Sequence, residues 1–183
     1  MIDRVLEDAL AQGIGSLSLL PLAKRIGVSA AALIYHFTSK EELTVVVLRR
    51  AGDRQRALFE TIRSRAGATP YETCRDIWGA AATPESVPLF RLFFEVYGLA
   101  LQDRNRFPDF FPGAIERWLD FIGSAFERSG TTRRDARIRA TTVLACFRGS
   151  LLDLCATEDY ERVNGAVELW LRSLSLASGS TTP

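Results

Sequence analysis

The chain of 183 residues has a single histidine, His36, and three cysteines that share no C-x-x-C spacing. Structural zinc sites need closely spaced cysteine and histidine ligands, so we expect no metal site. A glycine-rich phosphate loop and a nucleophile motif are also missing, which makes an enzyme the weakest interpretation and leaves no cofactor to expect. Cys74, Cys146 and Cys155 are interpreted as reduced thiols of a cytoplasmic protein.

Lysine is scarce, and charge of one sign does not dominate. The net charge of +1 excludes an overall basic coat, although it allows a local basic patch. The two lysines, Lys24 and Lys40, both lie in residues 18–50, where five basic residues face two acidic ones, whereas residues 51–183 carry 17 of each sign. This distribution indicates that any contact with phosphates involves the N-terminal segment.

Long apolar runs are absent as well. The uncharged stretches stop short of the roughly 20 residues that span a bilayer. The charged N-terminus lacks the apolar region of a signal peptide. With 47% apolar and 25% charged residues, the composition is that of a globular protein, and we expect it in the cytoplasm without a membrane partner.

Helical periodicity dominates, and no stretch alternates long enough to predict a sheet. The expected fold class is therefore all-α, with about nine helices separated by glycine and proline turns. Ser39 and Glu42 form a capping-box pattern, which predicts a long helix over residues 39–65. Gly67 to Pro70 is expected as a turn. Further helices are expected around residues 71–78 and over residues 89–101, 113–128, 132–156 and 160–176.

Residues 18–37 have the pattern of a helix-turn-helix. Ala23 is small where two helices would cross, and Gly27 stands where the turn favours a positive φ. Ser29 is placed to cap the second helix. The buried side is supplied by Leu22, Ile26, Val28, Leu33 and Phe37. The pattern predicts a small head that binds double-stranded DNA through its second helix.

The stretch from Ser18 to Ser29, then Leu33, and then the run from His36 to Leu43 closely resemble the head of the tetracycline-repressor (TetR) family. The resemblance covers about residues 4–50 by motif, and the remainder only by helix number and length. It implies a repressor that binds operator DNA as a homodimer through a four-helix bundle. The expected domains are residues 1–45 for DNA binding and 46–177 for ligand sensing and dimerisation, with a frayed tail over residues 178–183.

The recognition helix departs from the family pattern. It begins Ala30-Ala31-Ala32, and Ile34 holds the place of the usual tyrosine, with Tyr35 one residue later. Hydrogen bonding to base edges is therefore poorly supplied, and contacts with thymine methyl groups are expected to contribute more. The alternatives are that Ile34 and Tyr35 pack in the core. The phosphate candidates are Ser18, Lys24, Ser29, Tyr35, Thr38 and Lys40, and the groove-facing candidates are Ala30, Ala31, Ile34 and His36.

Aromatic residues are frequent between residues 71 and 150, where charges are sparse. The resemblance implies an effector among the middle helices, which we expect to be small, apolar and neutral. The alternative is that these residues form plain core. Glu95 lies among apolar residues without an evident paired carboxylate. The predicted ligand contacts are Trp78, Phe90, Phe93, Phe94, Tyr97, Phe110, Trp118, Phe121, Cys146 and Phe147.

The last two long helices carry apolar residues on more than one face, which indicates burial against more than one partner. We expect them to form the interface between two copies of the chain. A helical interaction protein that does not bind DNA is the main alternative function. The predicted interface residues are Val143, Leu144, Leu151, Leu152, Val163, Val167, Trp170 and Leu174.

Overall fold

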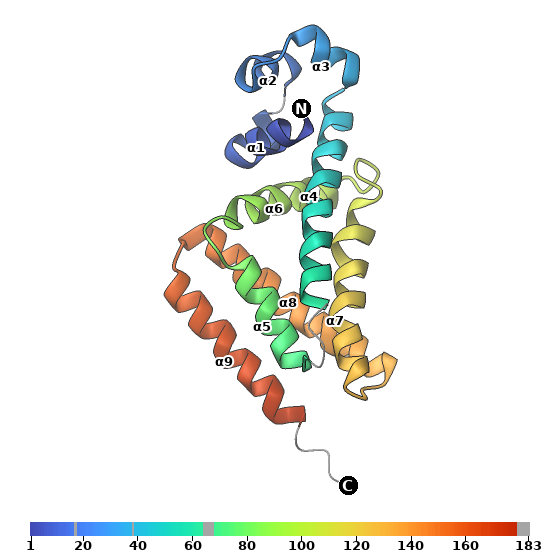
Figure 1. The fold of residues 1–183 in the computed structure, drawn as a ribbon, viewed down its shortest axis with the longest axis vertical. Helices are drawn as coiled ribbons and strands as arrows, with labels where there is room; N and C mark the ends of the chain where they lie inside the picture. Colours follow the sequence, from blue (N-terminus) through green and yellow to red (C-terminus); the bar gives the residue numbers. More distant parts are fainter. Residues whose placement is uncertain (17, 38, 64–67, 179–183) are drawn as a thin grey trace. The chain divides into compact units, whose positions relative to one another are not determined.

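The computed structural model describes the whole chain except residues 17, 38, 64–67 and 179–183. In this described part the elements are nine α-helices with two short 3-10 or π segments, and no strand occurs (Figure 1). The prediction of an all-α fold is confirmed. The predicted phosphate contact Thr38 lies outside the described residues, and so does the predicted frayed tail over residues 178–183 except for Ser178, which ends the last helix.

The chain forms two compact units. Unit 1 comprises Met1–Ala57 and Pro88–Phe110, and unit 2 comprises Leu58–Val87 and Phe111–Pro183. Helix α4 (Lys40–Arg63) belongs to unit 1 up to Ala57 and to unit 2 beyond it. The boundary predicted between residues 45 and 46 stays a prediction.

Unit 1 contains the N-terminal helices and most of α6 (Val87–Gln102). The order at its start is α1 (Ile2–Gln12), the 3-10 turn η1 (Ile14–Ser16), α2 (Leu19–Ile26) and α3 (Ala30–His36). Its fully buried side chains include Leu6, Leu22, Leu33, Leu43 and Val47. Ser39 accepts the N–H of Glu42 at 3.1 Å, so the predicted start of α4 is capped as expected.

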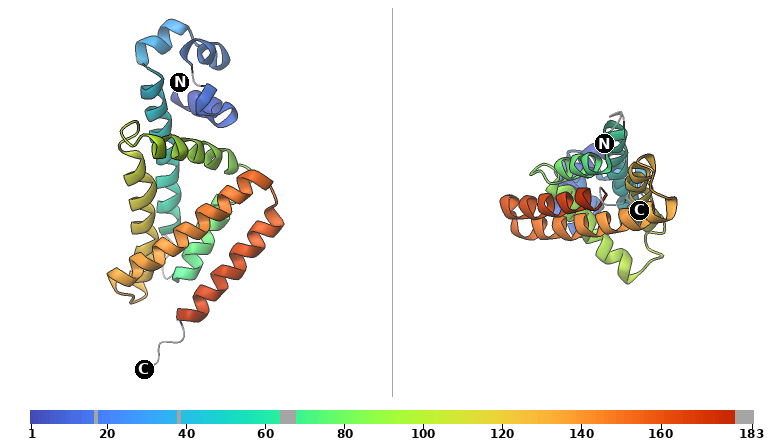
Figure 2. Two further views of the ribbon diagram at one scale, coloured as in Figure 1. Left: turned by 180° about the vertical axis from the view of Figure 1, so that it is seen from behind. Right: turned by 90° about the horizontal axis from the view of Figure 1, so that it is seen from below.

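Unit 2 contains α5 (Pro70–Ala81), the π segment η2 (Pro112–Glu116), α7 (Arg117–Arg128), α8 (Arg133–Thr157) and α9 (Tyr160–Ser178). Helix α9 packs against both α5 and α8, and the two views of Figure 2 show α8 and α9 as a pair. Among the described helices none is long and apolar enough to cross a bilayer.

Two helix starts differ from the sequence prediction. Pro70, expected in a turn, is the first residue of α5, because Thr69 and Glu72 cap that helix reciprocally. The helix expected from Gly113 instead begins with a π-helical turn at Pro112 before α7. By contrast, Thr132 caps α8 by accepting the N–H of Asp135, at the start predicted for this helix.

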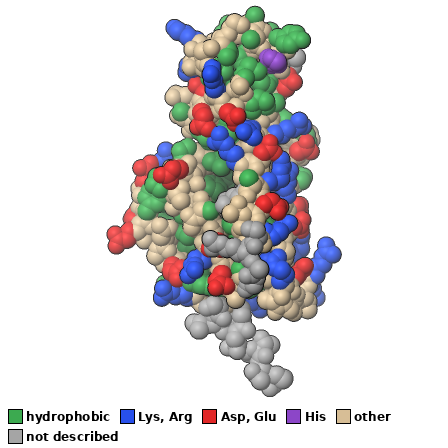
Figure 3. All heavy atoms as spheres, viewed as in Figure 1, with side chains coloured by type: hydrophobic (Ala, Val, Ile, Leu, Met, Phe, Trp, Pro, Cys, Tyr) green, Lys and Arg blue, Asp and Glu red, His purple; other side chains and the backbone are tan. Residues whose placement is uncertain are grey.

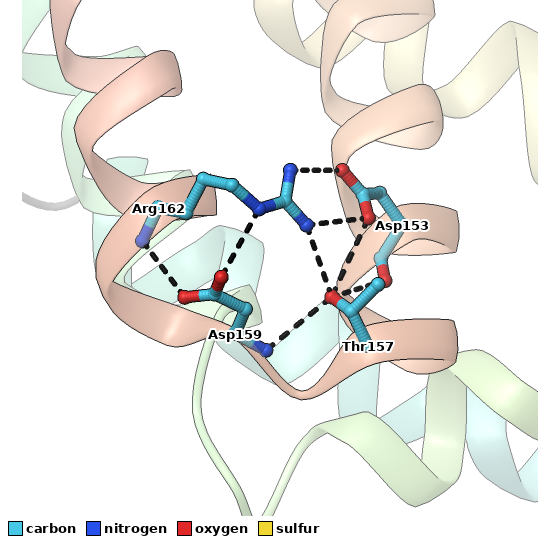
Figure 4. Close-up of polar contacts among 4 residues, drawn as sticks. All are labelled: Asp153, Thr157, Asp159 and Arg162. Atoms are coloured by element: carbon cyan, nitrogen blue, oxygen red, sulfur yellow. Dashed lines mark hydrogen bonds and ion pairs between the residues drawn. The ribbon is translucent and has the colours of Figure 1, made fainter.

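The turn between α8 and α9 is organised by one guanidinium (Figure 4). Arg162 donates two hydrogen bonds to the carboxylate of Asp153 at 2.8 and 2.9 Å, and its Nε donates to Asp159 at 3.1 Å. The Asp159 N–H donates in turn to the hydroxyl of Thr157. Between them Glu158 adopts a left-handed conformation, with φ of 54°. A bidentate Arg–carboxylate pair fixes geometry well, so these contacts define how α8 continues into α9.

Candidate nucleic-acid interface

The turn between α2 and α3 has the geometry that the sequence pattern predicts. Gly27 has φ of 69° and ψ of 41°, and an added Cβ would meet nothing within 4 Å. The left-handed backbone, and not lack of space, therefore favours glycine here. The Val28 N–H donates to the Ala23 carbonyl at 3.0 Å, and the Ser29 hydroxyl accepts the Ala32 N–H at 3.1 Å. Helix α2 is thus ended and α3 capped within three residues.

Helix α3 buries one side and exposes the other. Leu33 is fully buried and Phe37 nearly so, whereas Ile34 is 53% exposed and Tyr35 86% exposed. At 100° per residue, Ala31 and Tyr35 lie within about 20° of the direction opposite Leu33, and Ile34 lies about 60° from Ala31 on the same exposed side. Figure 3 shows apolar side chains, in green, on the surface at the top of the view, where Figure 1 labels α3. The alternative of Ile34 and Tyr35 as core residues is therefore wrong, and the exposed face of α3 is apolar with a phenol at its edge.

The other groove-facing candidates, Ala30 and His36, differ from each other in exposure and in position on α3. Ala30 is only partly exposed at the start of α3. His36 is exposed at its end, with its ring 5.4 Å from the Tyr35 ring in an edge-on arrangement and 6.4 Å from Phe37. The structure places His36 beside the apolar face instead of within it.

The described phosphate candidates lie in unit 1, where all are exposed except Lys40, which is half-buried. Lys24 is exposed on α2, and Ser18 is exposed at the start of the same helix, where its hydroxyl makes no capping bond. The Ser29 hydroxyl is used by the cap of α3. The Lys40 ammonium donates to the Gly15 carbonyl at 2.8 Å, which leaves two of its three hydrogens for another acceptor.

The arginines near the head behave differently from the lysines. Three of them pair with carboxylates of α1, and these pairs tie α1 to α2 and to α4. The guanidinium of Arg50 holds the pKa of Asp3 below its ordinary value. The sequence did not reveal these pairs, because their members lie 17 to 47 residues apart. The pairs are Arg25–Asp8, Arg50–Asp3 and Arg54–Glu7, each with an N···O distance of 2.7 Å.

Half of the predicted effector contacts lie in unit 1. Phe93 on α6 contacts the rings of Phe94, Tyr97 and Phe110, with centroids 5.3 to 5.6 Å apart. All four rings are half-buried, as is Phe90. The structure therefore brings these residues together as one partly exposed aromatic cluster, which we call the α6 cluster (Phe93, Phe94, Tyr97 and Phe110).

The other half lie in unit 2, mostly in its core. The Trp78 ring lies 5.4 Å from the Phe147 ring in a tilted arrangement, and Phe147 contacts Trp170 at 6.1 Å. The Trp78 indole donates to Asn164 at 2.9 Å. Packing between α5, α8 and α9 therefore accounts for Trp78 and Phe147. Trp118 and Phe121 are buried and Cys146 is partly buried. A surface depression of about 320 Å³ between α7 and α8 is lined by none of the predicted contacts.

The predicted dimer residues need correction. Five of them are at most 7% exposed within a single protomer, so they belong to the core of unit 2 and cannot form a surface for a second copy. The helical periodicity predicts that these residues are buried, but it does not tell whether they pack within one protomer or against a second copy. Leu152 is 53% exposed, and Trp170 and Leu174 are intermediate. The five core residues are Val143, Leu144, Leu151, Val163 and Val167.

A capped helix-turn-helix with an exposed second helix, on an all-helical chain, defines a DNA-binding regulator. Residues 9–47 match the family model described as bacterial regulatory proteins, tetR family. Within the described chain this segment holds α2, the turn at Gly27 and α3, so the head of the chain is similar to the DNA-binding segment of that family.

Similar proteins agree with this assignment. The chain is 28% identical over 164 residues to the HTH-type transcriptional regulator BetI of Rhizobium meliloti strain 1021, covering 89% of this chain and 68% of that protein. Its fold is similar to a transcriptional regulator from Rhodococcus sp. Rha1, with a TM-score of 0.80, 18% identity, and coverage of 94% and 92%. A TetR-family regulator from Streptomyces coelicolor has a TM-score of 0.76, 20% identity, and coverage of 94% and 95%.

Proposed function

We propose that the protein is a repressor that binds its operator as a homodimer and is released by a small apolar effector. The observation that carries the proposal is the exposed face of α3 on a capped helix-turn-helix head. A second helix that is short, capped and exposed is the element that enters the major groove in this class of protein. The matched TetR family acts through dimers on operator DNA.

The chemistry of α3 favours a particular kind of operator. Ala31 and Ile34 offer methyl groups and no hydrogen-bond donor, and the thymine C5-methyl is the apolar feature of the major groove. Each half-site therefore presents thymine methyl groups to these two side chains. Lys24 and Tyr35 are exposed and Lys40 is half-buried, and these three side chains supply contacts to phosphates that set the register without reading sequence.

The α6 cluster is the proposed contact for the effector. Its rings are half-buried, whereas Trp78 and Phe147 are occupied by the packing of unit 2. Aromatic walls with few charges suit a neutral apolar molecule. Binding releases DNA only if the effector prefers the DNA-free conformation, and a hundredfold release needs about 2.7 kcal/mol of differential affinity.

The proposed dimer surface is the exposed stripe of α8 and α9. On α8 the exposed positions recur at intervals of three or four residues, as one face of a helix requires, and on α9 Leu169 is 73% exposed. Small residues in the stripe allow two helix pairs to approach closely, as a four-helix bundle requires. The stripe consists of Ala145, Gly149, Leu152 and Ala156 on α8 and of Gly165, Ala166 and Leu169 on α9.

The test starts from a pool of random DNA duplexes, from which the purified protein selects its ligands. Enrichment of a two-fold symmetric sequence rich in thymine at fixed positions is the expected result. Half-sites about one helical turn apart would match a dimer with two heads. Failure to enrich any sequence, with the protein folded and dimeric, would instead favour the helical interaction protein.

A further inference from the structure

Glu95, the carboxylate without an evident partner in the sequence, makes two hydrogen bonds to the backbone of the turn between α1 and α2. Its Oε2 accepts the N–H of Ile14 at 2.8 Å, and its Oε1 accepts the N–H of Gly15 at 2.8 Å. Both bonds join residues about 80 positions apart within unit 1. A carboxylate that accepts two backbone N–H groups is held in one orientation, and it holds the turn in return.

The turn is built to receive this carboxylate. Gly13 has φ of 78°, and a Cβ added there would lie 2.9 Å from Glu95 Oε2. The backbone conformation therefore favours glycine, and a Cβ at this position would also displace the carboxylate. Ile14, the next residue, is buried, so the turn is also anchored by its side chain.

The same turn is bonded from the other side by Lys40. Its ammonium donates to the Gly15 carbonyl at 2.8 Å, while Glu95 accepts the Gly15 N–H. Gly15 is thus bonded at both ends, once from α6 and once from the first residue of α4. We call Glu95, the turn over residues 13–15 and Lys40 the clasp.

We infer that Glu95 is a positioning residue for DNA binding, which acts through the clasp on the start of α2 and on the Lys40 ammonium. The inference rests on the proposed DNA binding. The Gly15 carbonyl orients one hydrogen of the ammonium, and the remaining two face outward for a phosphate oxygen. Without Glu95 the turn becomes mobile, and the head must order it again each time it binds a duplex.

The clasp also gives α6 two functional faces. Phe93 of the α6 cluster and Glu95 are two residues apart, which separates their side chains by about 200° around the helix. A rotation or shift of α6 that follows a change at the aromatic face therefore moves the Glu95 carboxylate on the opposite face. The clasp is the contact through which such a movement reaches the head.

The experiment compares Glu95→Gln with wild type on a selected duplex, with Glu85→Gln, an exposed glutamate, as the matched control. The glutamine amide keeps the shape of the side chain but directs a donor at one of two backbone donors. We expect about a hundredfold weaker binding for Glu95→Gln, a factor of about ten for the charge-assisted bond lost in each of two heads, and no change for the control. The dependence of Kd on salt should stay that of wild type, because the number of phosphate contacts is unchanged.

Two further measurements keep the inference testable if Glu95→Gln does not fold. Gly13→Ala pushes against the carboxylate without removing it, and should weaken binding similarly. In the wild-type protein without DNA, the amide hydrogens of Ile14 and Gly15 should exchange slowly. Wild-type affinity in a folded Glu95→Gln or Gly13→Ala variant, or amides that exchange as fast as exposed peptide, would overturn the inference. Wild-type protein that binds no duplex would overturn the proposed function instead.

Discussion

Replacing Ile34 with alanine tests how the recognition helix reads DNA. The side chain is 53% exposed, so a duplex in contact with α3 covers about half of it. Full burial of an isoleucine stabilises by about 1.5–3 kcal/mol, so this coverage contributes about 1 kcal/mol per head. Two heads on one operator contribute about 2 kcal/mol, and Ile34→Ala should weaken binding about thirtyfold.

Fluorescence anisotropy with a labelled selected duplex measures this loss. Leu101→Ala, which truncates an aliphatic side chain of similar exposure (57%) on α6, serves as the matched control and should bind as wild type. Uracil in place of the thymines at the enriched positions removes the methyl groups alone, and should weaken wild-type binding but have little further effect on Ile34→Ala. If wild type bound the uracil and thymine duplexes equally, the reading of methyl groups by α3 would be refuted.

Three other perturbations follow from the structure. Leu169→Asp places a charge on the proposed dimer stripe, at a side chain that is 73% exposed in the protomer. The chain should therefore fold but sediment as a monomer, and an intact dimer would rule out the stripe as the interface. Burial raises the pKa of the Cys74 thiol to about 12, so Cys74 should resist alkylation at pH 8 until the protein unfolds, and rapid labelling of native protein would contradict its core position. Arg162 lowers the pKa of Asp153 below its ordinary 3.8, so the pair stabilises the fold above pH 3.8 and this contribution is lost as the pH falls further. Arg162→Gln should therefore reduce the loss of stability in acid, and an unchanged acid transition would count against the pair.

The head could be predicted from the sequence because its determinants are local. Gly27 and Ser29 act on the backbone within three residues of themselves, and Leu33 and Phe37 are spaced so that one face of a short helix is buried. Patterns of this length identify the turn, the cap and the buried face without knowledge of the rest of the chain.

The partners of buried or charged side chains could not be predicted in the same way. The periodicity predicts burial of Val143 and Val167, and both are buried, but it does not distinguish the core of a protomer from an interface. In the sequence Glu95 is a carboxylate among apolar residues, and its partners are backbone N–H groups about 80 residues away. Backbone donors leave no mark in the identity of a side chain, so no sequence pattern could have revealed them.

The ion pairs that tie α1 to its neighbours have a consequence for the number of copies a cell needs. Arg25, Arg50 and Arg54 are engaged by carboxylates of α1, which leaves less positive charge to attract DNA of arbitrary sequence. Affinity for such DNA comes almost wholly from neutralising phosphates, and a genome offers about 10⁶–10⁹ competing sites. A protein held weakly by those sites is little diluted over the chromosome. For the proposed repressor, the salt bridges inside the head thereby lower the abundance at which one operator stays occupied.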